Sequence, residues 1–158
     1  AAFAAPYSMK MLEIDAVGML DTTVEEMGKV FVTTELGGAG TASAKSIDIA
    51  RRGTINLLRH AGILAGSPVA APSRWLDMPS SDCFTFAEDD GLVAFVRDLG
   101  DAITVGETIA RVYPIGKTGL APVDYRASMS GLLAARHVPG LIKAGDCLSV
   151  IATVTENT

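Results

Sequence analysis

Cysteine and histidine are scarce in this sequence of 158 residues. Only Cys83, Cys147, His60 and His137 are present, and no two of them have the spacing of zinc ligands, which argues against a structural zinc site. Two cysteines far apart in the chain are typical of a protein from a reducing cytoplasm, so we expect a cytoplasmic location. A single disulfide between them is an alternative that the sequence leaves open.

Positive charge and long apolar runs are lacking too. The formal net charge is −5 and there is no cluster of Lys and Arg, which argues against a nucleic-acid partner. No apolar run approaches the roughly 20 residues that span a bilayer, so no membrane anchor is expected. The apolar start at residues 1–6 has no preceding basic residues and no initiator Met. We therefore expect a processed chain or a piece of a longer protein.

Several catalytic and nucleotide-binding motifs are incomplete. Residues 38–43 read Gly-x-Gly-x-x-Ser, which lacks the third glycine of a dinucleotide-binding loop. Lys45-Ser46 is placed as in a phosphate-binding loop, but alanines occupy both glycine positions. There is no Gly-x-Ser-x-Gly, and neither histidine lies near a nucleophile in sequence. The motifs favour neither a nucleotide-binding protein nor a serine or cysteine hydrolase.

Apolar residues make up 49% of the chain, enough for a core, and the pattern changes along it. Residues 1–66 predict an α/β layer with a short helix over 21–28, a strand over 29–36 and a long helix over 43–61. On the long helix, Ile47, Thr54 and Leu58 are predicted to face a core, whereas Lys45, Asp48, Arg52 and Asn56 fall on the solvent side. Residues 67–81 are predicted to be a linker, and Trp75 in it to fill a seam between units.

Glu35 is the candidate catalytic residue. It ends the β-branched and aromatic run Val30-Phe31-Val32-Thr33-Thr34 and precedes the glycines at 37, 38 and 40. Open α/β sheets bind ligands at the carboxyl ends of their strands, where a charged side chain is available for chemistry. The alternative from spacing alone is that Glu35 only solvates the loop.

Residues 82–158 predict an all-β module with an internal repeat. One copy begins at Gly91-Leu92-Val93 and the other at Gly131-Leu132-Leu133, about 40 positions later. Each copy continues through a turn, a Gly-acid turn at Gly106-Glu107 or Gly145-Asp146, and a closing strand. The repeat resembles the biotinyl/lipoyl fold, a barrel-sandwich of two interlocked sheets.

The carrier function of that fold is not predicted. Alignment with the biotinyl pattern puts Leu120 at the position of the modified lysine, and Lys117 nearby has no flanking Met. Met9-Lys10-Met11 copies the carrier tripeptide, but it lies far from the repeat. We interpret residues 82–158 as a structural or interaction module, with the carrier as a weaker alternative.

The block from Phe31 to Thr41, with the helix and the β repeat that follow, resembles the succinylglutamate desuccinylase/aspartoacylase family. Within the family, the likeness is closest to the N-acetyl-diaminobutyrate deacetylases of ectoine breakdown. Five further segments fit the same pattern and extend it over nearly the whole chain: residues 2–7, 81–84, 88–91, 134–137 and 143–146. The resemblance implies a partial zinc-carboxypeptidase-like sheet layer over residues 1–66, the carboxyl-terminal part of the catalytic domain.

Members of that family hydrolyse an N-acyl bond of a small amino acid. The resemblance implies that zinc polarises the acyl carbonyl and acidifies a water, and that Glu35, by its Thr-Glu-Leu-Gly motif, takes the water's proton. The family binds zinc through His-x-x-Glu and a second His upstream of this motif, and no His precedes Glu35 here. We expect the zinc ligands in an upstream half outside this chain, which alone should be inactive.

The leading hypothesis is therefore the carboxyl-terminal portion of a zinc-dependent N-acyl amino acid hydrolase. Its expected partners are the missing upstream half, a small N-acyl amino acid and, in one alternative, further copies of itself. The substrate-binding tyrosine of the family is not assigned to Tyr113 or Tyr125. The alternative function is a lipoyl-like interaction module without catalytic activity.

Overall fold

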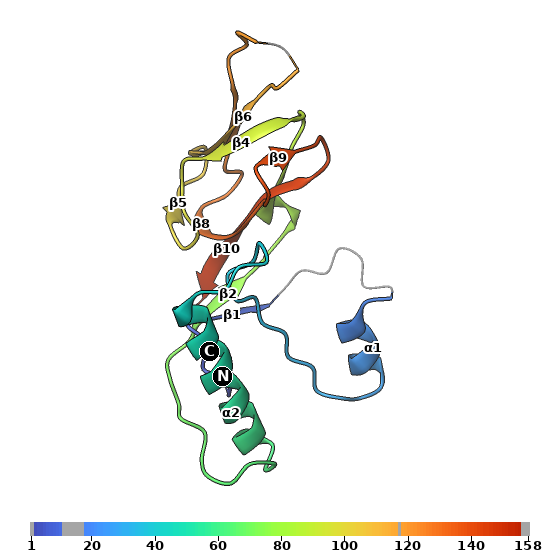
Figure 1. Cartoon of the computed structure of the whole chain (residues 1–158), viewed down its shortest axis with the longest axis vertical. Helices are drawn as coiled ribbons and strands as arrows, with labels where there is room; N and C mark the ends of the chain where they lie inside the picture. Colours follow the sequence, from blue (N-terminus) through green and yellow to red (C-terminus); the bar gives the residue numbers. More distant parts are fainter. Residues whose placement is uncertain (1, 11–17, 117, 156–158) are drawn as a thin grey trace. The chain divides into compact units, whose positions relative to one another are not determined.

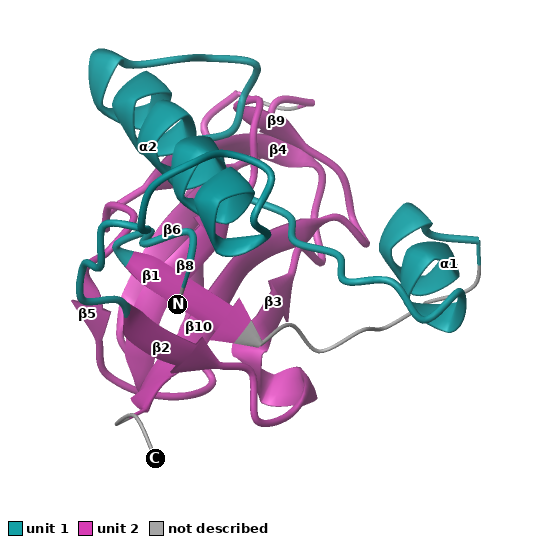
Figure 2. Ribbon diagram, turned by 90° about the horizontal axis from the view of Figure 1, so that it is seen from below, with its two compact units in different colours: residues 1–6, 12–73 teal, residues 7–11, 74–158 magenta. Residues whose placement is uncertain are grey.

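The computed structural model describes residues 2–10, 18–116 and 118–155, which form two compact units (Figure 1). Unit 1 comprises Ala1–Pro6 and Leu12–Ser73, and unit 2 comprises Tyr7–Met11 and Arg74–Thr158. Figure 2 colours the two units separately. The predicted strand pattern around residues 11–15 lies outside the described residues.

Unit 1 contains two helices, α1 (Leu20–Glu26) and α2 (Ala44–His60). Ser43 caps α2 because its Oγ accepts from the Ser46 amide at 3.1 Å, while Ser46 Oγ accepts from the Ser43 amide at 2.9 Å. Gly62 follows the helix with φ of +73°, as a C-terminal stop requires. The long helix predicted over 43–61 is confirmed. The short helix is also confirmed, although it begins after Met19 without a side-chain cap.

The strand predicted over 29–36 is wrong for this chain. Residues 29–36 form no strand, and Val30 is 93% exposed. A strand needs a neighbouring strand to satisfy its backbone N–H and C=O groups, and no strand lies in the described part of unit 1. The β-forming sequence is present, but no strand among the described residues of unit 1 pairs with it.

Asn56 was predicted to face solvent and is instead 4% exposed. Its Nδ2 donates to the Val69 carbonyl and its Oδ1 accepts from the Val69 amide, both at 2.9 Å. Gly53, one turn earlier, is buried because the Phe3 ring approaches so closely that a Cβ would lie 2.3 Å from it. This face of α2 therefore binds other parts of unit 1. The predicted solvent exposure of Asp48 and Arg52 is confirmed, and Asp48 forms ion pairs with exposed Arg51 and Arg52.

Unit 2 is built from two sheets that are antiparallel except for one pair of strands. The larger sheet has the order β1-β2-β10-β8-β5, with β3 also pairing with β10, and the smaller sheet has the order β7-β6-β4-β9. The larger contains β1 (Tyr7–Lys10), β2 (Arg74–Asp77), β3 (Phe84–Phe86), β5 (Ala102–Ile103), β8 (Gly131–Arg136) and β10 (Cys147–Thr155). The smaller contains β4 (Gly91–Phe95), β6 (Thr108–Tyr113), β7 (Val123–Arg126) and β9 (Leu141–Ile142). A one-turn 3-10 helix, η1 (Ser81–Cys83), precedes β3.

The predicted repeat over β4–β6 and β8–β10 is confirmed, and the two copies exchange strands. The short strand of each copy pairs with the first strand of the other, β5 with β8 and β9 with β4. Loop hydrogen bonds repeat as well: the Val105 amide donates to Ser130 Oγ at 2.9 Å, and the Ala144 amide donates to Asp90 Oδ1 at 2.8 Å. Neither copy can complete its sheet without the other.

The hydrophobic core lies in unit 2, between the two sheets. Its fully buried side chains come from both copies of the repeat, Ile109 and Val112 from β6, Leu133 from β8, and Leu148 and Ile151 from β10. Successive residues of a strand face opposite sides, and β10 is buried at every position over residues 148–152, so both faces of this strand are covered.

Strands β1 and β2 extend the larger sheet beyond the repeat. β1 runs parallel to β2, which pairs antiparallel with β10. The sequence pattern did not predict β2, which lies within the linker expected over 67–81, and Trp75 lies on this strand rather than in a loop. The disulfide that the sequence left open is absent, since Cys83 and Cys147 are both free thiols.

Candidate functional site

Glu35 lies on the irregular segment that leads to α2. Its side chain is exposed, and the described residues show no ion pair or hydrogen bond to it. The segment belongs to unit 1. A carboxylate in this state is free to interact with a reactant or with another polypeptide.

The loop after Glu35 is a run of left-handed residues. Gly37, Gly38, Ala39 and Gly40 have φ values of +110°, +73°, +58° and +64°. Glycine adopts such angles without steric cost, which explains why three of the four positions are glycine. The turn closes where the Thr41 amide and Oγ1 both reach the Gly38 carbonyl, at 3.1 and 2.9 Å. This geometry connects the Glu35 segment directly to the capped start of α2.

The described residues do not bring together three His, Cys, Asp or Glu side chains that could hold a metal ion. His60 is exposed in the last turn of α2, and His137 Nε2 lies 2.9 Å from the Leu141 carbonyl. A catalytic zinc site requires about three protein ligands. The part of the chain that the structure describes does not fit such a site.

Tyr125 is held by backbone groups. Its hydroxyl accepts from the Glu88 amide at 2.8 Å and from the Asp89 amide at 3.2 Å, and donates to Asp89 Oδ2 at 3.2 Å. It therefore ties β7 to the turn before β4. Tyr113, at the end of β6, is 40% exposed. The structure assigns Tyr125 a structural role and leaves Tyr113 accessible.

An open groove of about 430 Å³ runs between β3 and β7 in unit 2. Its apolar lining includes Phe84 and Phe86, whose rings stack at 5.9 Å, and Val123. Asp124, on the same wall, is already paired with Arg111 at 3.0 Å. Sequence reasoning did not predict this groove because it lies between two edge strands that are distant in sequence.

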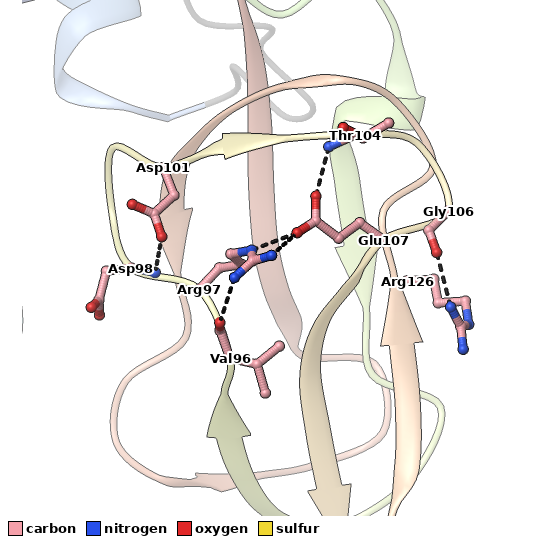
Figure 3. A network of polar contacts seen from close by, with 8 residues as sticks. All are labelled: Val96, Arg97, Asp98, Asp101, Thr104, Gly106, Glu107 and Arg126. Atoms are coloured by element: carbon pink, nitrogen blue, oxygen red, sulfur yellow. Dashed lines mark hydrogen bonds and ion pairs between the residues drawn. The ribbon is translucent and has the colours of Figure 1, made fainter.

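A polar network rigidifies the turn before β6 (Figure 3). Arg97 forms an ion pair with Glu107, whose Oε2 accepts from the Thr104 amide at 2.9 Å. The amide hydrogen bond first, and then the arginine, hold the pKa of the Glu107 carboxyl below its usual range. Arg126 closes the turn on the other side by donating to the Gly106 carbonyl at 3.0 Å. The charged side chains of Arg97, Glu107 and Arg126 therefore already have partners within unit 2.

Comparison with known proteins connects this architecture to one family. The succinylglutamate desuccinylase/aspartoacylase catalytic domain matches residues 1–61. Over 158 residues the chain is 46% identical to the N-alpha-acetyl-L-2,4-diaminobutyric acid deacetylase of Halomonas elongata, covering 99% of this chain and 46% of that protein. Over nearly its whole length, the chain is similar to members of the succinylglutamate desuccinylase/aspartoacylase family.

Solved structures of succinylglutamate desuccinylase/aspartoacylase proteins agree with this. The product-bound ectoine utilization protein EutE (DoeB) of Ruegeria pomeroyi is 54% identical, with a TM-score of 0.92 over 96% of this chain and 46% of that one. A succinylglutamate desuccinylase/aspartoacylase from Rhodobacter sphaeroides is 27% identical, with a TM-score of 0.87 over 99% of this chain and 48% of that one. The chain thus has the sheet-rich fold of the matched part of these proteins.

The predicted likeness to N-acetyl-diaminobutyrate deacetylases is confirmed by the Halomonas elongata and Ruegeria pomeroyi relatives. The chain spans about half the length of these succinylglutamate desuccinylase/aspartoacylase relatives. Within the described residues, no helix combines the length and apolarity needed to cross a membrane.

Proposed function

We propose that this chain is part of a zinc-dependent hydrolase that removes an N-acyl group from a small amino acid, and that Glu35 is its proton acceptor. The observation that carries the proposal is the Thr34-Glu35-Leu36-Gly37 motif, which lies within the residues matched by the family's catalytic domain. The relative with 46% identity is a deacetylase of N-acetyl-2,4-diaminobutyrate. We take a compound of that class as the substrate.

Hydrolysis of an amide needs a group that accepts a proton from water and returns it to the leaving amine. A carboxylate performs both steps if it lies within hydrogen-bonding reach of the water and the nitrogen. Glu35 meets the chemical requirement, because its exposed carboxylate has no partner among the described residues.

Zinc, when bound, would polarise the acyl carbonyl. The described residues of this chain do not fit a zinc site, so we assign the zinc ligands to the polypeptide upstream of this chain. We assign residues 1–66 to the carboxyl-terminal part of the catalytic domain and 82–158 to the β module. Of residues 67–81, expected to be a linker, Arg74–Asp77 form β2 and belong to the larger sheet of unit 2. The complete enzyme is placed in the cytoplasm, in agreement with two free thiols.

The test is Glu35→Gln in the complete enzyme, meaning the polypeptide that joins this chain to the upstream half. We expect kcat for an N-acetyl amino acid to fall by about 100-fold or more, because the amide cannot accept a proton. Glu26→Gln, an equally exposed glutamate on α1, is the matched control and should leave kcat unchanged. Unchanged turnover in Glu35→Gln would refute the role of Glu35.

Zinc analysis distinguishes the zinc-dependent hydrolase from the alternative, a lipoyl-like interaction module without catalytic activity. The complete enzyme should retain zinc after gel filtration, and this chain alone should retain none and be inactive. Tight zinc binding by this chain alone would contradict the assignment of the ligands to the upstream half.

A second candidate function is a lipoyl-like interaction module, formed by residues 82–158. The reciprocal pairing of β5 with β8 and of β9 with β4 favours a biotinyl/lipoyl-like barrel-sandwich. Leu120, at the position of the carrier lysine, is 55% exposed in the loop between β6 and β7. Without an acceptor amine there, a carrier is not favoured; an intact mass bearing a biotinyl or lipoyl increment would reverse this.

A further inference from the structure

Unit 2 consists of two halves that are bound to each other by strand pairing. We call β2–β6 (residues 74–113) the first half and β7–β10 (residues 123–155) the second half. Strands β7, β8 and β9 pair with β6, β5 and β4 respectively, and β10 pairs with β2 and β3. Among the described strands of the second half, only β8 and β10 pair with each other. Both sheets of unit 2 therefore contain strands of both halves.

The core and the loops connect the same two halves. Fully buried side chains of both halves form a single cluster: Ile109 and Val112 from the first, Leu133, Leu148 and Ile151 from the second. The Gly100 amide of the first half donates to the Leu133 carbonyl of the second at 2.9 Å. The Val93 amide likewise donates to the Gly140 carbonyl at 2.7 Å. Each half therefore requires a complementary half to bury its apolar side chains and to satisfy its backbone groups.

A single loop, between β6 and β7, joins the two halves covalently. Pro114 and Pro122 lie at its two ends, and a proline favours extended backbone at the residue before it. The chain turns at Gly119, whose φ is +82°, an angle that a residue with a side chain adopts only at a steric cost. No atom lies within 4 Å of the position of a Cβ at Gly119, so the backbone angle alone requires glycine there. The loop thus combines extended ends with a turn that depends on one residue.

We propose that unit 2 exchanges its second half with a second copy of this chain, so that β7–β10 of each copy complete the first half of the other. The loop between β6 and β7 extends, with Gly119 as the hinge. The strand pairs and core contacts of the monomer then form again between the two copies. Exchange of identical elements is a low-cost route to a dimer because it reuses these interactions. The interface needs no residue outside unit 2, and the proposal does not depend on the proposed function.

Exchange requires that the two halves separate first, because they are bound to each other in the monomer. It therefore takes place during folding and depends on the concentration of the chain. A short connection gives the attached half an effective concentration of about millimolar, so a second copy competes with it only at high chain concentration. Any change that strains the closed loop shifts the competition toward the second copy.

The first experiment refolds the full chain at low and high concentration and measures the mass by gel filtration with light scattering. The fraction of dimer should rise with concentration. Gly119→Ala should raise the ratio of dimer to monomer at least about fivefold, because the side chain strains the closed loop and not the extended one. Gly106→Ala is the matched control: Gly106 also has a φ of +82° and no atom within 4 Å of its Cβ position. It lies within the first half, so its strain is equal in monomer and dimer and the ratio should not change.

The second experiment identifies which chain supplies each strand. Leu92 on β4 and Leu141 on β9 are directly opposite each other and exposed. Leu92→Cys/Leu141→Cys is made together with Cys147→Ser, which removes the exposed native thiol, and the dimer fraction is oxidised. In the exchanged dimer the disulfide joins two copies, so a dimeric band should persist on a denaturing gel without reductant. The control, Ala94→Cys/Arg111→Cys, joins β4 to β6 within the first half and should give only monomers on the same gel.

Three results would overturn the proposal. One is a monomeric mass at every soluble concentration, in wild type and in Gly119→Ala. Another is a dimer in which the disulfide of Leu92→Cys/Leu141→Cys leaves only monomers on the denaturing gel, since that dimer would use a different surface. The third is an equal gain of dimer in Gly106→Ala, which would exclude Gly119 as the hinge. The disulfide test needs no hinge variant, and no readout uses activity, so retained turnover in Glu35→Gln would refute only the proposed catalytic role.

Discussion

The side-chain amide of Asn56 forms two hydrogen bonds with the backbone of Val69. Asn56 Nδ2 donates to the Val69 carbonyl and Oδ1 accepts from the Val69 amide, each at 2.9 Å. A helix side chain thus satisfies both backbone groups of Val69, as a neighbouring strand would in a sheet. The side chain of Asn56 is buried, whereas that of Val69 is 66% exposed. The two hydrogen bonds, rather than apolar contact, hold the segment after α2 against the helix.

Asn56→Ala should therefore destabilise unit 1 by about 1–2 kcal/mol, because two backbone groups lose their partner. Amide exchange in α2 measures this, since faster exchange reports easier opening. Asn56→Asp keeps the acceptor but places a buried carboxylate oxygen against the Val69 carbonyl oxygen, so it should destabilise unit 1 at least as much as Asn56→Ala. Arg52→Ala, which removes only an exposed ion pair with Asp48, is the control and should change exchange little. Equal exchange in Asn56→Ala and wild type would show that the two hydrogen bonds are energetically neutral.

Gly91 and Gly131 are equivalent positions of the repeat, and both lack room for a side chain. A Cβ would lie 2.5 Å from the Tyr113 carbonyl oxygen at Gly91 and 2.5 Å from the Ala152 carbonyl oxygen at Gly131. Both obstacles are backbone atoms of the neighbouring strand in the same sheet, so the paired strands would have to move apart. We expect Gly91→Ala and Gly131→Ala each to cost about 1–3 kcal/mol.

Thermal unfolding followed by Trp75 fluorescence reports on this, since Trp75 lies on β2 of unit 2. Each variant should lower Tm by several degrees, at about 4–8 °C per kcal/mol. Gly116→Ala is the matched control, because no atom lies within 4 Å of its Cβ position. A fall in Tm for Gly116→Ala as large as for Gly91→Ala would contradict the steric explanation.

Glu107 should make the stability of unit 2 depend on pH. The Thr104 amide and Arg97 lower the pKa of its carboxyl in the folded state below the usual value of 4.5. The stabilisation is therefore complete above the unfolded pKa and is lost as the pH falls through the lower folded pKa. Glu107→Gln should lower the free energy of unfolding at neutral pH, and this difference should shrink at acid pH, as the carboxyl becomes protonated in the folded state too.

Urea unfolding of both proteins at the two pH values measures this difference. Glu26→Gln, an exposed change in unit 1, should show no difference from wild type in unit 2. A destabilisation by Glu107→Gln that stays constant down to acid pH would mean that the carboxylate charge is not responsible.

The two thiols should differ in reactivity. Cys83 is fully buried, in contact with Met78 and Val150, and burial raises the pKa of its thiol. Cys147, at the start of β10, is exposed; desolvation raises the pKa of its thiol as well, so accessibility is what distinguishes the two residues. Iodoacetamide should modify one thiol in the native chain and two in denaturant, with mass spectrometry placing the first on Cys147. Rapid labelling of Cys83 in the native chain would mean that β3 and β10 open far more readily than their packing indicates.

Local sequence determined the elements whose stabilising interactions are themselves local. The Ser43 cap, the Gly62 stop and the periodicity between them predict α2 within a residue or two, because helix hydrogen bonds connect neighbours in sequence. The repeat was equally visible, since Gly91 and Gly131 must be glycine wherever a carbonyl approaches so closely. The family resemblance around Glu35 also came from contiguous residues.

Only the tertiary structure decided what depends on distant partners. Val30, Phe31 and Val32 have the composition of a strand, yet a strand exists only where another strand supplies hydrogen bonds, and unit 1 supplies none among its described residues. Helical periodicity likewise distinguishes an apolar face from a polar one but not which face finds a partner: Ile47 is exposed, whereas Asn56 is buried by two hydrogen bonds to Val69. Strand pairing and side-chain burial depend on residues that are distant in sequence. A short stretch of sequence therefore shows that a strand or a buried face can form, but not whether it does.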